Sequence, residues 1–278
     1  MRKIKTNIYL ENGFSGVQLG LIVTDDGLLL VDSPIRLEDG RAWLNQVAEL
    51  GDPHYSVVLD HHPDRVVGAR DLGMPIIGHR YTRQHLASKS DSFKGSAHPI
   101  GAETDRLKRI TGVSRSIPDL TFLRKMKLRM GKTEIEFWHK PGPTRGAIWV
   151  VSHRYKVIFI GDTVWIGEPP YIGHANLGDW ISSLDDLRSS KFNSYRFISS
   201  RDGLVQREDI NAMARLIRKF QLRVERFSKK VDPEPAIAIA THEIMKSFKL
   251  NDSRGELARF RIQTGFEDLY KQLFEVED

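Results

Sequence analysis

The stretch that decides the fold is YSVVLDHHPDR, residues 55–65. Its first half is a short β-branched run, which is typical of a buried strand. Its second half sets two imidazoles and two carboxylates directly after that strand. Burying these groups together costs free energy unless a cation or hydrogen bonds compensate them. The stretch predicts a strand that delivers polar side chains to its carboxyl end, with a solvated surface loop as the plain alternative.

Three more polar groups follow predicted strands farther along the chain. They are PGPTRG at residues 141–146, Gly161-Asp162, and SSRDG at residues 199–203. Loops at strand ends collect at one edge of a sheet, where active sites are usually built. We therefore expect the four groups to share one pocket.

The order of predicted elements mixes β-hairpins with helices. Residues 20–23 and 28–31 flank Thr24-Asp25-Asp26-Gly27, a hairpin signal because Gly supplies the positive φ of such turns. Further strands are predicted at 75–78, 128–130, 132–138, 147–151, 157–160 and 195–198, and helices near 43–50, 82–112, 180–187, 210–227, 235–248 and 256–274. Sheets and helices in this order favour an α/β sandwich in one domain, residues 1–278, mainly helical from about residue 205.

The composition is ordinary for a globular chain of 278 residues, with 40% apolar and 28% charged residues. Cysteine is absent, so disulfides and thiolate metal sites are excluded, and a metal has to be held by His, Asp, Glu or backbone oxygen. No apolar run approaches the roughly 20 residues of a membrane span, and the N-terminus lacks a secretory apolar stretch. We expect a cytoplasmic protein with no membrane partner, and the sequence indicates no oligomeric state.

The net charge of +6 mildly favours anionic partners. Residues 207–230 carry eight basic side chains against three acidic ones. The solvated face of an amphipathic helix explains this excess. Nucleic-acid binding is the alternative, although no nucleic-acid motif accompanies the charge.

In the order of its elements, the sequence resembles the metallo-β-lactamase-like hydrolase superfamily over roughly residues 7–227. The matching elements are the hairpin at 20–32, the stretch 57–68 for the His-x-His-x-Asp-His loop, 141–146 for the Gly-His-Thr turn, Gly161-Asp162 for the bridging aspartate, and 202–205 for the last His-Gly turn. The resemblance implies a four-layer α/β/β/α sandwich and hydrolysis at a metal centre.

The metal-binding motif departs from the family pattern at four of five histidine positions. His62, Asp64 and the bridging Asp162 are kept. The other positions hold Asp60, Arg65, Pro143 and Asp202, while His61 occupies a variable slot. The resemblance therefore implies an eroded metal centre.

Arg65 is expected to replace one metal ion electrostatically, because a guanidinium has a permanent charge and five donors with which to bridge Asp64, Asp162 and Asp202. The other half of the site keeps Asp60, His62 and Asp162. These ligands suit one divalent ion such as Mn²⁺ or Fe²⁺, whereas a zinc site prefers more imidazole.

Charge balance leaves several states of the pocket open. Four aspartates against one arginine give about −3 if all ionise, which burial disfavours. Either a cation (Mn, Fe or Zn) enters, some carboxylates are protonated, or the pocket is wet. A pair of metal ions, a single metal ion and no metal all remain alternatives. Asp202 is a further candidate metal ligand.

Three functions follow from the resemblance and the charge. In a hydrolase of a small substrate with at most one ion, Asp64 or His61 would accept the proton and His174 would line the substrate pocket. A non-catalytic member would keep the pocket for a small ligand or a partner. A nucleic-acid-binding member would use the basic residues 207–230. The sequence identifies no substrate.

Overall fold

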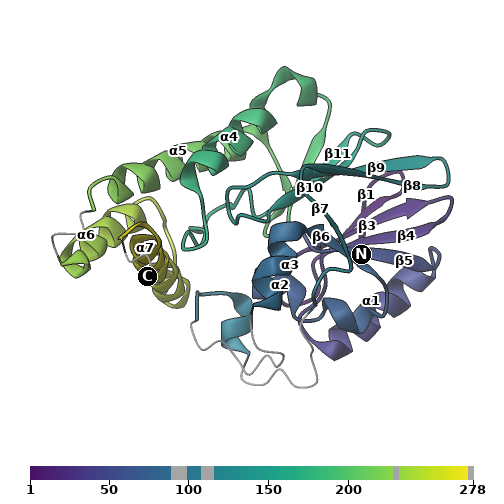
Figure 1. Cartoon of the computed structure of the whole chain (residues 1–278), viewed down its shortest axis with the longest axis horizontal. Helices are drawn as coiled ribbons and strands as arrows, with labels where there is room; N and C mark the ends of the chain where they lie inside the picture. The colour runs from purple at the N-terminus through teal and green to yellow at the C-terminus, as the bar shows by residue number, and fades with distance from the viewer. Residues whose placement is uncertain (89–98, 108–115, 228–231, 275–278) are drawn as a thin grey trace.

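The computed structural model describes residues 1–88, 99–107, 116–227 and 232–274. It contains two β-sheets that lie face to face (Figure 1). The first sheet has seven strands that are neighbours in chain order: β1 Arg2–Lys5, β2 Ile8–Glu11, β3 Leu19–Thr24, β4 Gly27–Val31, β5 Pro53–Val57, β6 Ile76–His79 and β7 Leu120–Phe122. Strands β1 to β4 are antiparallel and β4 to β7 are parallel, so the parallel half directs its carboxyl ends to one edge.

The second sheet has six strands. In spatial order they are β13 Gly203–Val205, β12 Arg196–Ser199, β11 Val157–Gly161, β10 Ile148–Ser152, β9 Thr133–His139 and β8 Lys125–Met130. Only β11 and β12 are parallel, and the crossover between them contains helix α4, Leu177–Arg188. Both of these strands end at the edge that the parallel half of the first sheet also reaches, because Asp162 after β11 contacts Arg65 and Arg201 after β12 contacts Asp64.

Alternation along the strands divides the core into layers, because successive side chains point to opposite faces of a sheet. Ile22, Leu29 and Val31 belong to the cluster between the sheets, together with Phe137 and Phe159 from the second sheet. The intervening residues Leu21, Leu28 and Leu30 pack on the other face, against Trp43 and Val47 of helix α1, Leu37–Ala48. The predicted hairpin is confirmed, and Gly27 adopts φ 86° in its turn.

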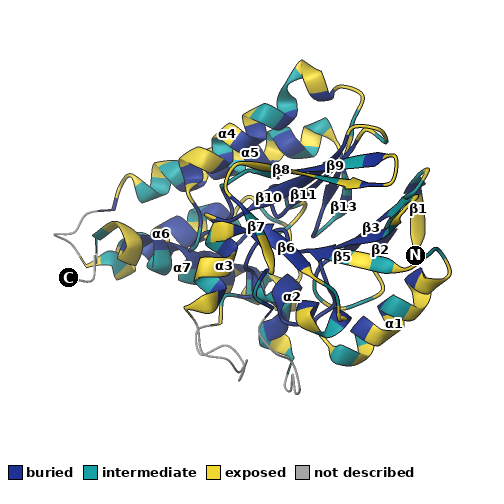
Figure 2. Ribbon diagram, turned by 45° about the vertical axis from the view of Figure 1, so that its right-hand side comes forward, coloured by how far each residue is buried: buried dark blue, intermediate teal, exposed yellow. Residues whose placement is uncertain are grey.

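Helices cover both outer faces (Figure 2). Trp149, Val151 and Ile158 of the second sheet pack against Trp180 of α4 and Ile217 of α5, Arg207–Val224. Helices α6, Pro233–Met245, and α7, Asp252–Phe274, add to the same cluster. On the first sheet's outer side lie α1, α2 (Pro63–Val66) and α3 (Arg80–Ala87). The predicted α/β/β/α sandwich is confirmed.

Some predicted elements differ from the structure. Strands β1, β2 and β7 have no counterpart among the predicted strands. The helical pattern predicted over 82–112 gives helix α3, which ends at Ala87, and a 3-10 turn at Glu103–Arg106. Pro99 and Gly101 interrupt the helical pattern between them. Residues 89–98 and 108–112 of that prediction lie outside the described part of the chain. No helix among the described residues combines the length and apolar character that crossing a membrane requires.

Candidate active site

Charged side chains from both sheets meet where the strands end. They are Asp32 after β4, Asp60 and His62 after β5, Asp64 and Arg65 on α2, Asp162 after β11, and Arg201 after β12. Local structure directs several of them inward. The amide of Leu59 donates to Asp32 Oδ1 (3.0 Å), and Pro63 at the first turn of α2 starts the helix immediately after His62. Of the residues predicted to share one pocket, Asp60, His62, Asp64, Arg65 and Asp162 therefore lie together in the structure.

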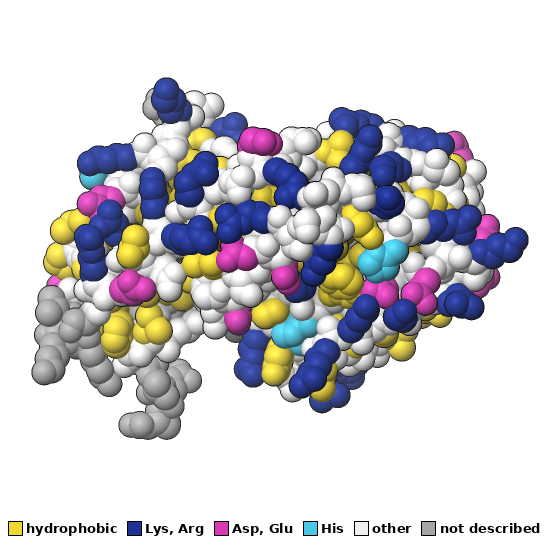
Figure 3. All heavy atoms as spheres, turned by 90° about the horizontal axis from the view of Figure 1, so that it is seen from above, with side chains coloured by type: hydrophobic (Ala, Val, Ile, Leu, Met, Phe, Trp, Pro, Cys, Tyr) yellow, Lys and Arg dark blue, Asp and Glu magenta, His cyan; other side chains and the backbone are white. Residues whose placement is uncertain are grey.

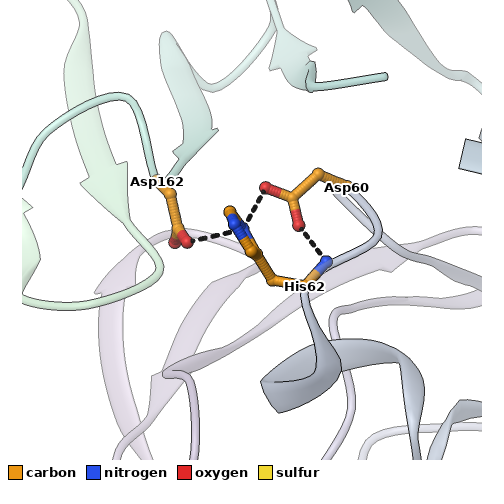
Figure 4. Close-up of side chains that lie close together, drawn as sticks. All are labelled: Asp60, His62 and Asp162. Carbon is orange, nitrogen blue, oxygen red and sulfur yellow. Dashed lines mark hydrogen bonds and ion pairs between the residues drawn. The ribbon is translucent and has the colours of Figure 1, made fainter. Parts of the chain in front are cut away.

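Asp60, His62 and Asp162 form the centre of the site (Figure 4). Nδ1 of His62 lies 3.0 Å from Asp60 Oδ2 and 3.2 Å from Asp162 Oδ2, and the His62 amide donates to Asp60 Oδ1 (2.9 Å). Burial disfavours the imidazolium of His62, but the charges and hydrogen bonds of the two aspartates raise its pKa to about 9. At neutral pH the Nδ1 atom therefore carries a proton.

Arg65 is wholly buried and contacts three carboxylates. Its Nε lies 3.0 Å from Asp60 Oδ1, its Nη1 lies 3.2 Å from Asp32 Oδ2, and its Nη2 pairs with Asp162. Of the three partners predicted for Arg65, only Asp162 is in contact. Asp32 and Asp60 take the places expected for Asp64 and Asp202, because Arg65 points back toward the ends of β4 and β5.

Arg201 is a second guanidinium at the centre, 13% exposed, which the sequence reasoning missed. It donates to Asp162 Oδ1 (3.0 Å) and Oδ2 (2.8 Å) and to Asp64 Oδ2 (2.6 Å), and it stacks on Trp165 at 4.6 Å. The signal was present in the SSRDG group, but the resemblance pointed to Asp202 there in place of its neighbour. Asp202 instead accepts a hydrogen bond from the amide of Ile166 (2.8 Å).

These contacts set the pKa values of the carboxylates. Burial alone would raise the pKa of Asp60 and of Asp162, but Arg65, Arg201 and His62 outweigh burial, so the pKa of Asp60 is lowered and that of Asp162 is well below its usual range. The contacts of Asp32 with Arg65, Ser200 and the Leu59 amide do not outweigh its burial, so burial raises its pKa to about 6.

The balance of charge differs from the predicted −3. The buried acids are Asp32, Asp60, Asp64 and Asp162, and the cations that face them are Arg65, Arg201 and protonated His62. Two guanidiniums and an imidazolium oppose four carboxylates, so the excess negative charge is about one. The cluster is therefore largely compensated by the protein's own cations.

Asp64 and His61, the two predicted proton acceptors, lie in different surroundings. Asp64 accepts hydrogen bonds from the amide (2.9 Å) and hydroxyl (3.1 Å) of Thr104 as well as from Arg201, and these contacts outweigh burial to lower its pKa. His61 is buried beside His174, with 3.3 Å between Nε2 and Nδ1. Burial, followed by neighbouring histidines, lowers the pKa of His61 well below 6.5.

Access to the centre is narrow. The cavity beside His62 measures about 10 Å³, which is about the space of one water molecule. Gly101, Trp165 and Arg261 are among the residues that line it. A separate cleft of about 680 Å³ lies along α4, α5 and α7, and His174, predicted to line a substrate pocket, forms part of its wall.

The residues at the centre do not fit a pair of metal ions. Both oxygens of Asp162 already accept hydrogen bonds from Arg201, and Arg65 occupies the space between Asp32, Asp60 and Asp162. A single ion has enough donors, since one ligand atom each from Asp60, His62 and Asp162 lie within 4.8 Å of one another. That ion would have to displace the His62 proton.

One face of the molecule carries many basic side chains (Figure 3). Figure 3 shows Lys and Arg interspersed with acidic groups across one whole face. Within α5, Arg218 lies 3.6 Å from Asp185, and Arg223 pairs with Glu243 at 2.8 Å. Lys229 and Lys230, part of the predicted basic segment, lie outside the described residues.

Comparison with known proteins identifies the fold. No family model matches the chain, and no curated protein matches it. The inverting sec-alkylsulfatase Pisa1 from Pseudomonas sp. superposes with a TM-score of 0.70 and 15% identity over 97% of this chain, which spans 49% of that enzyme. The chain has the metallo-β-lactamase fold. A metallo-β-lactamase family protein from Thermus thermophilus gives a TM-score of 0.65 at 17% identity, covering 98% of this chain and 95% of that one. The DIM-1 metallo-β-lactamase gives 0.60 at 17% identity, covering 79% and 96%.

Placing the chain in the metallo-β-lactamase fold gives the departures a structural meaning. The positions where the resemblance expects histidines hold Asp60 and Arg65 at the centre, buried Pro143, whose side chain has no donor atom, and Asp202 on the Ile166 amide. Guanidinium groups therefore lie among the carboxylates where the resemblance implies a metal centre.

Proposed function

We propose that this chain is a small-molecule-binding member of the metallo-β-lactamase fold, in which arginines replace the metal pair and hydrolysis at that centre is lost. The observation that carries the proposal is the pair of guanidiniums on Asp162, one wholly buried (Arg65) and one largely shielded from solvent (Arg201, 13% exposed). Arg65 and Arg201 both bind Asp162, and together they also engage Asp32, Asp60 and Asp64. A catalytic metal needs free donor atoms and an open coordination position, but Arg201 already binds both oxygens of Asp162, and Arg65 contacts Asp60 and Asp162.

The cleft along α4, α5 and α7 is the candidate ligand site. Its volume of about 680 Å³ falls within the range of small-molecule pockets. Val224, Phe227 and Leu269 supply apolar surface, while Arg145 and His174 supply polar groups. This lining suits a molecule with an apolar body and an anionic or hydrogen-bonding end.

Fluorescence of 8-anilinonaphthalene-1-sulfonate tests the cleft, because this probe has an apolar ring system and an anionic end. We expect one saturable site on the native protein. Val224→Trp, which fills the cleft, should weaken binding about tenfold or more, a loss of about 1.4 kcal/mol or more. Leu128→Trp is the matched control, since it fills a different cleft of about 420 Å³ beside the amino ends of β5 and β6. Equal effects of both variants would contradict the proposed site.

Manganese binding tests the loss of metal chemistry. Mn²⁺ prefers carboxylate and water ligands, and its six-line EPR signal in solution fades when a protein takes it up. We expect the signal to persist at one equivalent of protein. Uptake of one ion per chain that Asp162→Asn abolishes would contradict the proposal.

A single-ion hydrolase is the second candidate function. It is favoured by the donors of Asp60, His62 and Asp162 lying within 4.8 Å of one another. In that case Mn²⁺, Fe²⁺ or Zn²⁺ would polarise water or a substrate oxygen. Asp64 or His61 would accept the proton, and the substrate would enter from the cleft beside His174. Mn²⁺ uptake, together with hydrolysis of any member of a panel of sulfate esters, phosphate esters and lactams, would favour this function over the first.

A further inference from the structure

Among the described residues, two pairs of histidines stack with ring centres less than 4 Å apart, and one of these pairs has a structural explanation. The rings of His79 and His139 stack at 3.9 Å and 10°. Nε2 of His79 contacts the carbonyl of Leu123 at 2.8 Å, and the amide of Tyr81 donates to its Nδ1 at 3.2 Å. Nε2 of His139 contacts the carbonyl of Arg145 at 2.9 Å. Backbone groups thus satisfy this pair, which ties β6, β9 and their loops together.

In the second pair, His61 and His85, the buried ring is that of His61, and backbone groups do not satisfy it in the same way. His61 and His85 stack at 3.8 Å and 21°, and His174 lies against both, with ring centres at 4.9 and 5.5 Å. His61 is 8% exposed, and its Nδ1 has no hydrogen-bond partner in the structure. Its other nitrogen, Nε2, faces Nδ1 of His174 at 3.3 Å. Three separate elements, the loop after β5, helix α3 and the loop before α4, bring these imidazoles together.

The separation of the two facing nitrogens is that of a metal site as well as of a hydrogen bond. Ligands at about 2.0–2.1 Å around a tetrahedral ion lie about 3.3–3.4 Å apart. Imidazole is a suitable ligand for Zn²⁺, Cu²⁺ and Ni²⁺. An ion can also reach the cluster, because His85 and His174 are half-buried and His174 lines the 680 Å³ cleft.

We infer that His61 and His174 bind one divalent ion of the zinc and copper class, with His85 turning from its stacked position to supply the third imidazole. This site differs from the Asp60, His62 and Asp162 group in its residues and in its chemistry. It does not depend on the ligand-binding function proposed above, and a metal held there would lie at the wall of the cleft.

Copper EPR tests the inference, because hyperfine coupling to nitrogen reports how many imidazoles hold Cu²⁺. We expect the intact, metal-free chain to bind one Cu²⁺ with coupling to three nitrogens, and Zn²⁺ to compete for it. His174→Ala should weaken binding about tenfold or more, since even the loss of an outer partner of a metal ligand costs about 10–100-fold. His85→Ala should lose one nitrogen coupling. His174→Gln serves as a second variant if the alanine variant does not fold.

His139→Ala is the matched control, since it removes one ring of the other stacked pair and should leave the copper signal unchanged. Copper binding that survives His174→Ala and His174→Gln would overturn the site, as would equal loss in the control. Loss on Asp60→Asn with retention in His174→Ala would assign the ion to the aspartate group instead. An unchanged spectrum for His85→Ala would remove His85 from the ligand set. Assignment of the ion to the aspartate group would count against the proposed function as well. The other failures leave the proposed function standing, because the Mn²⁺ experiment reports on the aspartate group alone.

Discussion

Arg65 and a divalent cation would balance the same buried carboxylates, but they leave different chemistry behind. A guanidinium has donors only and no vacant coordination position, so it cannot activate water or bind a substrate oxygen as a Lewis acid does. It also cannot dissociate or be exchanged. With Arg201 holding Asp162 and Asp64 in the same manner, the centre acts as a permanent part of the core.

Removing the Arg65 guanidinium tests this structural role. Breaking a buried ion pair from one side typically costs about 3–5 kcal/mol, because the remaining charges stay desolvated. We expect Arg65→Ala to lower the free energy of unfolding by about this amount at pH 7. The loss should be smaller at pH 5, where Asp32, with its pKa of about 6, takes up a proton. Denaturant unfolding at both pH values measures it.

Arg70→Ala is the control for Arg65→Ala. Arg70 also pairs with an aspartate, Asp119 at 3.3 Å, but its side chain is 42% exposed, and exposed pairs contribute about 0–1 kcal/mol. If Arg65→Ala unfolded like the parent across pH 5–8, the guanidinium would not be compensating buried charge.

His62 predicts how stability varies with alkaline pH. Its pKa of about 9 in the folded chain lies above the ordinary value of 6.5, so the folded state binds the proton more tightly. The resulting stabilisation is fully present below pH 6.5 and is lost as the pH rises through 9. A shift of this size corresponds to up to about 3 kcal/mol. Unfolding free energies measured from pH 6 to 10 should fall, and His62→Gln should flatten that fall. A parent profile that is flat over this range would show that His62 is neutral in the folded protein.

Sequence reasoning predicted only some of the residues that form the centre. Asp60, His62 and Asp162 were recognisable because each follows a strand whose apolar pattern is clear. Arg201 and Asp202 are consecutive, and only the tight turn between β12 and β13 decides which of them points inward. Asp32 also follows a predicted strand, but it joins the centre only because Arg65 on α2 reaches it.

At the scale of elements, α7 holds the segment that closes the centre. Arg261 is 5% exposed and donates to the carbonyl of Gly101 through Nε (3.0 Å) and Nη2 (2.8 Å). Gly101 has φ 74°, and a Cβ there would lie 2.9 Å from the Arg261 side chain. Three residues later, Thr104 binds Asp64. A C-terminal helix thus fixes a loop against the central carboxylates.

Arg261→Ala tests whether this contact keeps the loop closed. We expect the amide hydrogen of Thr104 to exchange about tenfold faster or more, which corresponds to about 1.4 kcal/mol of local opening free energy. Arg254→Ala is the control, because Arg254 pairs with the same Glu168 (2.5 Å) from an exposed position, while Arg261 also holds Gly101. Equal exchange in the parent and in Arg261→Ala would mean that other contacts close the loop.

The whole sandwich was easier to predict than its individual edges. Strands β10 and β11 are buried on both faces, and β3 and β4 are buried on both faces over most of their length, so their signal is strong. Strands β1 and β7 lie at a sheet edge, are only three or four residues long and carry exposed side chains, which weakens their alternation. The four layers follow from the strong elements alone. The arginine-compensated centre required the packing of loops from both sheets.

Helix α7 determines whether the sandwich and its C-terminal helices unfold together, as the single-domain prediction requires. Ile262 and Phe266 are fully buried, and Phe266 packs on Phe220 of α5 with ring centres 5.4 Å apart. Each such side chain contributes about 1.5–3 kcal/mol, and Leu269 and Tyr270 are buried too, so their sum rivals the net stability of about 5–15 kcal/mol of a whole domain. A chain ending at Asn251 should therefore lose its cooperative thermal transition. Phe260→Ala, on the exposed side of α7 with a 42% exposed ring, should melt like the parent. A sharp transition near the parental midpoint in the truncated chain would show instead that the sandwich is stable without α7.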